Sequence, residues 1–242
     1  MSDLKIPLLL VSACGLHYTM TPPTARPPAK ERLNPSGWEV VVPWIHHAFK
    51  GVYWTLTLSE TLVAYTAINP TSVVSRSIIS YLVRRPNADD VISQVGRLTP
   101  AFLAGCCLSL TGSLLRSYCY HVLGRLFTFE LSIRQQHKLV TSGPYSFVRH
   151  PSYTGALCVA MGISLCHLNP RSWLVTCSGL FPTSDAGITN TLVGAWACIC
   201  TVVYFGLKSR MEKEDAMLEG TFGTEWRLWA KKVPCRLIPW VY

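Results

Sequence analysis

Five apolar stretches separated by polar connections organise this chain of 242 residues. Their approximate bounds are 6–20, 41–68, 100–120, 153–168 and 188–207. A helix of about 20 apolar residues crosses a hydrocarbon core of about 30 Å, and lipid offers the backbone no hydrogen-bond partner outside that helix. The pattern therefore predicts an all-α, polytopic integral membrane protein with about five transmembrane helices.

The connections between these stretches differ in character. A Pro-rich connector, TPPTARPPAKERLNPSG, follows the first stretch, a polar loop covers residues 69–99, and an insert, SGLFPTSDAG, precedes the fifth stretch. Residues 208–242 form a charged and aromatic tail. The first stretch follows a lysine, as a signal peptide would, but it ends in HYTMTPP without a small-residue cleavage site, which favours a retained span.

Composition supports the membrane class. Hydrophobic residues make up 49% and charged residues 14%, and the mean hydropathy is +0.27, whereas soluble domains have about 25% charged residues. The formal charge of +9 also suits nucleic acid, but the basic residues fall mostly between apolar stretches, so no nucleic-acid partner is expected. Most of the ten cysteines lie inside apolar stretches and no C-x-x-C pair occurs, so no metal site is expected.

Lysine and arginine are distributed unequally between the two sides of a five-span arrangement. The N-terminus, the second gap and the fourth gap hold six, whereas the first gap, the third gap and the tail hold fourteen. Cytosolic segments are the richer in lysine and arginine. The count predicts that the third gap and the tail both face the cytosol, where they can build one site.

The third gap carries a high density of polar groups in HKLVTSGPYSFVRHPSYTG, residues 137–155. Gly143 and Pro144 favour a bend, and Pro151 suits the first turn of the fourth helix. A helix start presents backbone N–H groups and a partial positive charge, which suit a carboxylate. The alternative is an interfacial loop whose Tyr, His and Arg side chains anchor at the headgroups.

Arg210 and Glu214 lie four residues apart on a helix expected to continue from the fifth stretch into the tail. They share one face of that helix, so one interpretation is a surface ion pair that contributes about 0.3 kcal/mol. An arginine fork also binds a carboxylate at two points and remains cationic. The tail adds Phe222, Trp226 and Trp229, whose side chains are expected to pack or to cover a site.

These two regions, HKLVTSGPYSFVRHPSYTG and SRMEKEDAMLEGTFGTEWRLWAKKVP, resemble the isoprenylcysteine carboxyl methyltransferases, membrane enzymes that methylate the C-terminal prenylated cysteine of processed CaaX proteins. The resemblance covers roughly residues 130–242. It implies a site for S-adenosylmethionine and a substrate-binding role for Arg210. The implied cofactor-binding residues are Glu130, His137, Lys138, Leu139, Val140, Tyr145, His150, Pro151, Ser152, Tyr153 and Glu214. Glu130 departs from the family, which has glutamine at this place.

The reaction that the resemblance implies is attack of the acceptor carboxylate on the sulfonium methyl group, with Arg210 and Glu214 as catalytic residues and no general base. A prenyl chain is stabilised by lipid, so the acceptor is expected to enter laterally between spans. The small residues Gly155, Ala156 and Gly206 leave room for such a slot, although small residues also serve plain helix packing.

The expected setting is the endoplasmic reticulum membrane, with several spans and the active site facing the cytosol. Residues 1–120 are expected to hold three spans with their loops, and residues 121–242 a catalytic region with two spans and the tail. The expected partners are the lipid bilayer and the prenylated C-terminal cysteine of CaaX proteins. A phospholipid methyltransferase, an NADPH-dependent membrane sterol reductase and a non-enzymatic scaffold are the alternatives, and a transfer assay with each acceptor distinguishes them.

Overall fold

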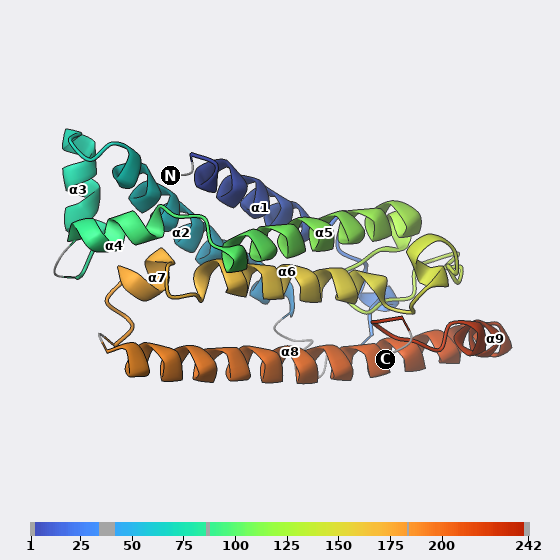
Figure 1. Ribbon diagram of the computed structural model, residues 1–242. Helices are drawn as coiled ribbons and strands as arrows, with labels where there is room; N and C mark the ends of the chain where they lie inside the picture. Colours follow the sequence, from blue (N-terminus) through green and yellow to red (C-terminus); the bar gives the residue numbers. More distant parts are fainter. Residues whose placement is uncertain (1–2, 34–41, 86–87, 183, 240–242) are drawn as a thin grey trace. The chain divides into compact units, whose positions relative to one another are not determined.

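The computed structural model describes residues 3–33, 42–85, 88–182 and 184–239. These residues form helices and turns, with no β-strand among them (Figure 1). The α-helices are α1 (Lys5–Thr19), α2 (Val42–Ile68), α3 (Val73–Leu82), α4 (Ala88–Val95), α5 (Pro100–Leu123), α6 (Pro151–His167), α7 (Trp173–Thr176), α8 (Asp185–Phe222) and α9 (Thr224–Lys232). The all-α class is thus confirmed for the described ranges. The end of the Pro-rich connector, Thr183 of the insert and the last three residues of the tail lie outside them.

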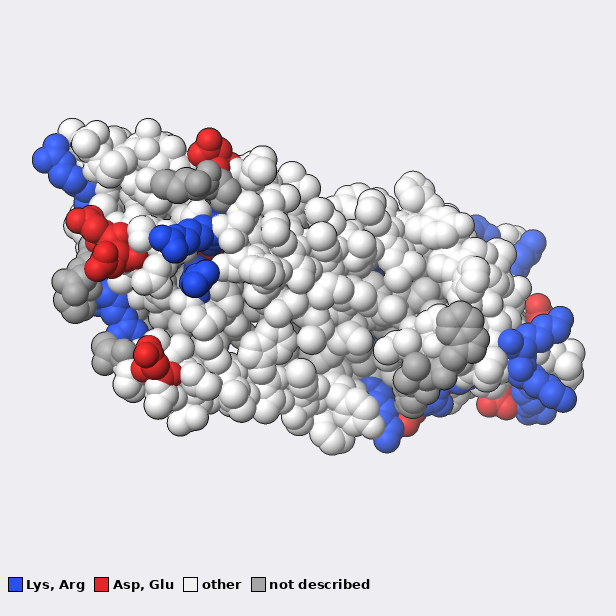
Figure 2. All heavy atoms as spheres, viewed as in Figure 1, with Lys and Arg blue, Asp and Glu red and all other residues white. Residues whose placement is uncertain are grey.

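Each of the five apolar stretches corresponds to a helix, in the order α1, α2, α5, α6 and α8. The α6 helix begins at Pro151, as expected for a proline in a first turn. The α8 helix runs from Asp185 through Arg210 to Phe222, so the continuation of the fifth stretch into the tail is present. In Figure 2 the visible middle of α8 carries no charged side chain, in agreement with its apolar sequence.

The expectation of a polar loop at residues 69–99 is wrong in part, because this segment contains the two helices α3 and α4. Ser72 caps α3 by accepting a hydrogen bond from the backbone N–H of Val74 at 3.2 Å. Ile92 and Val95 of α4 are buried in one cluster with Val63 of α2. The search for apolar runs misses these helices because each is shorter than a membrane span.

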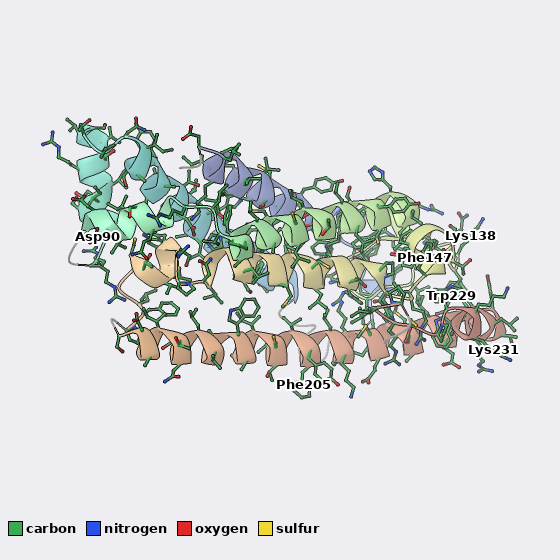
Figure 3. The ribbon with its side chains drawn as sticks, in the orientation of Figure 1. Asp90, Lys138, Phe147, Phe205, Trp229 and Lys231 are labelled. Carbon is green, nitrogen blue, oxygen red and sulfur yellow. The ribbon has the colours of Figure 1, made fainter. Side chains whose placement is uncertain are left out.

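Among the described residues, α8 is the one helix that is long and apolar enough on its own to cross a membrane. A second span is present if Asp89–Val95 and Pro100–Leu126, which meet at 43°, form one broken span. Within the apolar window of α8 only 6% of the residues are buried, and Val202 and Phe205 are more than half exposed. Phe205 projects outward from α8 in Figure 3. The count of five spans stays a prediction.

The chain groups into two compact units, each built from separate segments. The first comprises Met1–His17, Phe49–Leu110 and Val159–Cys200, and the second comprises Tyr18–Ala48, Thr111–Cys158 and Thr201–Tyr242. The tail and the whole loop motif, residues 137–155, belong to the second unit, together with the Pro-rich connector. The division at residue 120 expected from the sequence stays a prediction.

A fully buried carboxylate, Glu60 of α2, lies in the first unit. Lys5 Nζ of α1 lies 2.7 Å from Glu60 Oε1, and His167 Nδ1 of α6 lies 3.0 Å from Glu60 Oε2. A buried charge without a partner is costly, so these contacts fix three helices in one register. The count of lysine and arginine assumed that Lys5 lies at the membrane interface, which is wrong. Without Lys5, the N-terminus, the second gap and the fourth gap hold five of these residues, against fourteen in the other connections.

Glycines allow α5 and α6 to approach closely within each unit. In the first unit a Cβ on Gly105 would lie 2.7 Å from the carbonyl oxygen of Gly162, and in the second a Cβ on Gly155 would lie 2.7 Å from that of Gly112. Small residues permit such contacts between helices. Gly155 therefore serves helix packing and not a lateral slot. Gly206 is different, because a Cβ at this position would meet no atom within 4 Å.

Candidate active site

The tail folds back as a short helix that packs against the loop before α6. Gly223, with φ of 52°, separates α8 from α9 in a backbone conformation that side chains disfavour. Trp226 and Trp229 are buried in one cluster with Tyr145, and Trp229 Nε1 donates a hydrogen bond to the Tyr145 carbonyl oxygen at 3.2 Å. Figure 3 shows Trp229 beside the loop that carries Phe147. The two tryptophans therefore pack the tail onto the loop.

A cavity of about 300 Å³ in the second unit is bounded by this loop and by parts of α5, α6, α8 and α9. Its volume is at the lower end of the range of ligand pockets, about 300–1,000 Å³. All predicted binding residues except Pro151 line it. They are Glu130, His137, Lys138, Leu139, Val140, Tyr145, His150, Ser152, Tyr153, Arg210 and Glu214. The structure thus brings the loop motif and the α8 pair to one cavity.

The hydroxyl of Tyr153 joins the two regions. Tyr153 Oη donates to Glu214 Oε2 at 2.5 Å and accepts from Arg210 Nε at 2.7 Å. Arg210 also donates from Nη2 to the carbonyl oxygen of Phe129. Hydrogen bonds with a charged partner are roughly twice as strong as neutral ones. Arg210 and Glu214 are therefore held in the cavity wall and do not form a simple surface ion pair on an exposed helix face.

Asp215, the residue after Glu214, is a buried carboxylate that no sequence pattern indicated. Its Oδ1 lies 3.0 Å from His150 Nε2, and its Oδ2 lies 3.1 Å from Arg149 and 3.3 Å from Arg236. A carboxylate beside Nε2 favours a proton on that nitrogen of the imidazole. Asp215 therefore orients His150 and ties the start of α6 to α8 and to the C-terminal segment.

The C-terminal segment also covers the backbone at the start of α6. The N–H groups of Arg149 and His150 donate to the carbonyl oxygens of Cys235 and Arg236, each at 2.9 Å. The sequence suggested that free N–H groups at this helix start suit a carboxylate ligand. These two donors precede the helix and are satisfied by the tail. Within the first turn, the N–H groups of Tyr153 and Thr154 donate to the carbonyl oxygen of His150 at 3.0 and 3.2 Å, so side chains of the cavity are the better candidates to bind a ligand.

Burial sets the protonation of two side chains in the loop. Burial lowers the pKa of His137 below its usual range, against the opposite effect of the nearby Glu214 carboxylate. The neutral ring fits its contact, because His137 Nδ1 accepts a hydrogen bond from the backbone N–H of Arg134 at 3.2 Å. Burial also raises the pKa of Tyr145 well above its usual range, so the phenol stays protonated. His137 and Tyr145 of the loop are therefore neutral beside the charged α8 pair.

Glu130 lines the cavity, but its carboxylate is engaged by the Pro-rich connector. Glu130 Oε1 lies 2.7 Å from Arg26 Nε, and Oε2 lies 3.7 Å from Arg32 Nη1. The resemblance implies a neutral glutamine at this place, and the two cations balance the charge that Glu130 carries here. A contact between Glu130 and a cofactor stays a prediction.

Arg116 of α5 is a cavity residue that the motifs did not include. It is 7% exposed, and its Nη1 donates to the carbonyl oxygen and to Oγ of Ser152 at 3.1 and 3.0 Å. Its Nε donates to the carbonyl oxygen of Thr19 at 3.0 Å. The available signal was a single charge inside an apolar stretch, since such charges face protein or a functional cavity. Other lining residues that sequence patterns missed are Met20, His46, Arg149, Leu207, Met217 and Leu218.

Comparison with known proteins identifies the central part of the chain. Residues 103–182 match the isoprenylcysteine carboxyl methyltransferase family. This segment is therefore similar to that family. It includes the whole loop motif, residues 137–155, and ends before Arg210. The match confirms the resemblance carried by the loop motif, whereas the second motif, SRMEKEDAMLEGTFGTEWRLWAKKVP, lies beyond the matched residues.

Relatives named as methyltransferases extend the similarity. Protein-S-isoprenylcysteine O-methyltransferase B of Arabidopsis thaliana is 29% identical over 132 residues, which are 54% of this chain and 55% of the relative. Protein-S-isoprenylcysteine O-methyltransferase of Saccharomyces cerevisiae is 37% identical over 73 residues, 29% of this chain and 30% of the relative. The chain thus spans about half the length of the plant member of the isoprenylcysteine carboxyl methyltransferase family that it matches.

Proposed function

We propose that the chain transfers the methyl group of S-adenosylmethionine to the C-terminal carboxylate of a prenylated cysteine in processed CaaX proteins, which gives a methyl ester. The observation that carries this proposal is the Tyr153 bridge between Arg210 and Glu214 in the cavity wall. An arginine suits the carboxylate of the acceptor, and a glutamate suits the ammonium group of the donor. The family match and the names of the relatives support the same chemistry.

The residues of the cavity fit a donor of this kind. Leu139, Val140 and Trp229 offer apolar and aromatic surface for a planar base, and Tyr153 and Glu214 offer polar groups. When bound, S-adenosylmethionine supplies a methyl group on a positively charged sulfur. The acceptor carboxylate is ionised at neutral pH, so the chain has no need of a general base.

The chain itself contributes orientation and exclusion of water. Arg210, held by Tyr153 and by the carbonyl oxygen of Phe129, would fix the acceptor carboxylate. The packed tail, with Trp229 in the cavity wall, would limit the access of water. Orientation of this kind lowers barriers by up to about 7–11 kcal/mol in well-aligned model systems.

We infer that α1, α2, α5, α6 and α8 cross the endoplasmic reticulum membrane and that the cavity faces the cytosol. The exposed apolar surface of α8 and the excess of lysine and arginine on that side support this topology. A C-terminal tag should be accessible to protease in sealed vesicles, and an N-terminal tag should be protected. Accessibility of both tags would show that the number of spans is even.

A transfer assay tests the function. Membranes that contain the full chain are incubated with methyl-labelled S-adenosylmethionine and, in separate reactions, with prenylcysteine, with phosphatidylethanolamine, or with a sterol and NADPH. The expected result is base-labile label in prenylcysteine, which Arg210→Ala abolishes while calorimetry shows donor binding largely retained. Label in the phospholipid supports the phospholipid methyltransferase instead, and NADPH-dependent reduction of the sterol supports the reductase. Absence of label in prenylcysteine refutes the proposed function.

A further inference from the structure

A second cavity adjoins the candidate site in the same unit. It has a volume of about 340 Å³ and is lined by the Pro-rich connector, by the start of α2 and by residues 128–130. Arg26 and Trp44 belong to its wall but not to that of the first cavity. His46, Phe129 and Glu130 line both cavities. The two cavities therefore share one partition, and the connector closes the second from the other side.

Two hydrogen bonds attach the connector to residues on either side of residues 128–130. Thr24 Oγ1 donates a hydrogen bond to the carbonyl oxygen of Phe127 at 2.7 Å. Further along, the N–H of Leu33 donates to the carbonyl oxygen of Leu131 at 2.9 Å. These contacts fix both ends of the part of the connector that passes the second cavity.

Glu130 supplies the charged attachment between those ends, through its pairs with Arg26 at 2.7 Å and Arg32 at 3.7 Å. The Glu130 side chain is 16% exposed, so its carboxylate is largely withdrawn from water and directed at the connector. The preceding residue, Phe129, accepts a hydrogen bond from Arg210 through its carbonyl oxygen. Two consecutive residues thus link the connector to the arginine of the proposed acceptor site.

We propose that Glu130 is a positioning residue that holds the connector as a wall of the acceptor subsite, and that it does not contact the methyl donor. Glu130 lines both cavities, but its carboxylate pairs with Arg26 and Arg32 of the connector. Residues implied for the donor, such as His137 and Leu139, line the first cavity and not the second. The second cavity, which meets the first at Phe129, then takes the part of the acceptor next to its carboxylate. The identity of that acceptor rests on the proposed function.

A double-mutant cycle tests this assignment. Glu130→Gln introduces the neutral residue that the family has, and Arg26→Gln removes its nearer partner. Each single variant is expected to raise the acceptor KM by about two- to fivefold, the range of a partly exposed ion pair, while the donor Kd from calorimetry stays unchanged. The double variant should be no worse than either single variant, because the two residues act as one unit. Weakened donor binding in Glu130→Gln, or additive effects, would overturn the proposal.

Glu219→Gln is the matched control, since Glu219 Oε1 lies 2.8 Å from Arg227 Nε in an ion pair outside both cavities. This variant should change neither the acceptor KM nor the donor Kd. Hydrogen exchange supplies a second readout that does not depend on activity. Residues 24–33 should exchange faster in Glu130→Gln than in the wild-type chain. Unchanged exchange would refute the attachment, whereas a wild-type chain that leaves prenylcysteine unmethylated would refute the proposed function alone.

Discussion

Replacement of Tyr153 by phenylalanine removes one oxygen atom and keeps the ring, so it isolates the bridge between Arg210 and Glu214. That oxygen makes hydrogen bonds of 2.7 and 2.5 Å to the two charged groups. In the variant the side chains of Arg210 and Glu214, four residues apart on α8, can approach one another and form a direct contact. That contact replaces one of the two lost hydrogen bonds, so the net loss amounts to one hydrogen bond. A hydrogen bond to a charged group contributes about 1.5–3 kcal/mol, which predicts a fall in kcat/KM of about 10- to 150-fold.

The assay follows base-labile label in prenylcysteine while the concentrations of donor and acceptor are varied in turn. Tyr118→Phe is the matched control, because Tyr118 is 52% exposed on α5 and does not line the cavity. The control should keep the kinetics of the wild-type chain. If Tyr153→Phe also keeps them while the chain remains active, the bridge has no part in catalysis and the site has been assigned wrongly.

Three further predictions concern stability in detergent. Asp215→Asn removes the charge of a carboxylate shared by a histidine and two arginines, so it should lower the free energy of unfolding by about 3 kcal/mol and with it the unfolding temperature. The control Asp90→Asn, at an exposed position, should leave the unfolding temperature unchanged. The pKa of His137 is lowered from 6.5 in the folded chain, so its contribution to the free energy of unfolding is complete above about pH 6.5 and is lost as the pH falls through the folded pKa. His137→Gln should flatten this pH dependence, which is measured by unfolding at several pH values. Gly155→Ala places a methyl group against a carbonyl of α5 and should lower the unfolding temperature, whereas Gly206→Ala meets open space and should not.

Local features of the site follow from the sequence better than its long-range contacts do. The length and apolar content of the stretches predict α6 and α8, and Pro151 predicts where α6 begins. The meeting of Tyr153 with Arg210, 57 residues apart, follows from no local pattern. The motifs of a known family indicated that both belong to one site, and the structure shows the hydroxyl that connects them.

The long-range ion pairs could not be predicted, because their partners come from segments with no periodic pattern. Asp215 receives one of its arginines from the C-terminal segment, and Glu130 receives both of its arginines from the Pro-rich connector. Arg116 was visible as a charge in an apolar stretch, but its acceptors at Thr19 and Ser152 depend on how distant segments pack. Such pairings are decided by the tertiary structure and leave little trace in residue spacing.

The pairing of carboxylates that are buried or mostly covered also indicates where a ligand can act. Glu60, Glu130 and Asp215 each lie within 4 Å of cationic side chains, as apolar surroundings demand of a charge. The cations beside Glu60 and Glu130 lie outside the first cavity. Asp215 does not line that cavity, although its partners Arg149 and His150 do. The group of Glu214 and Arg210 differs, because both charges and the tyrosine hydroxyl between them line the cavity. A donor with an ammonium group and an acceptor with a carboxylate can each compensate one of these charges, so this group is the one that ligands of both kinds can engage without leaving a buried charge unpaired.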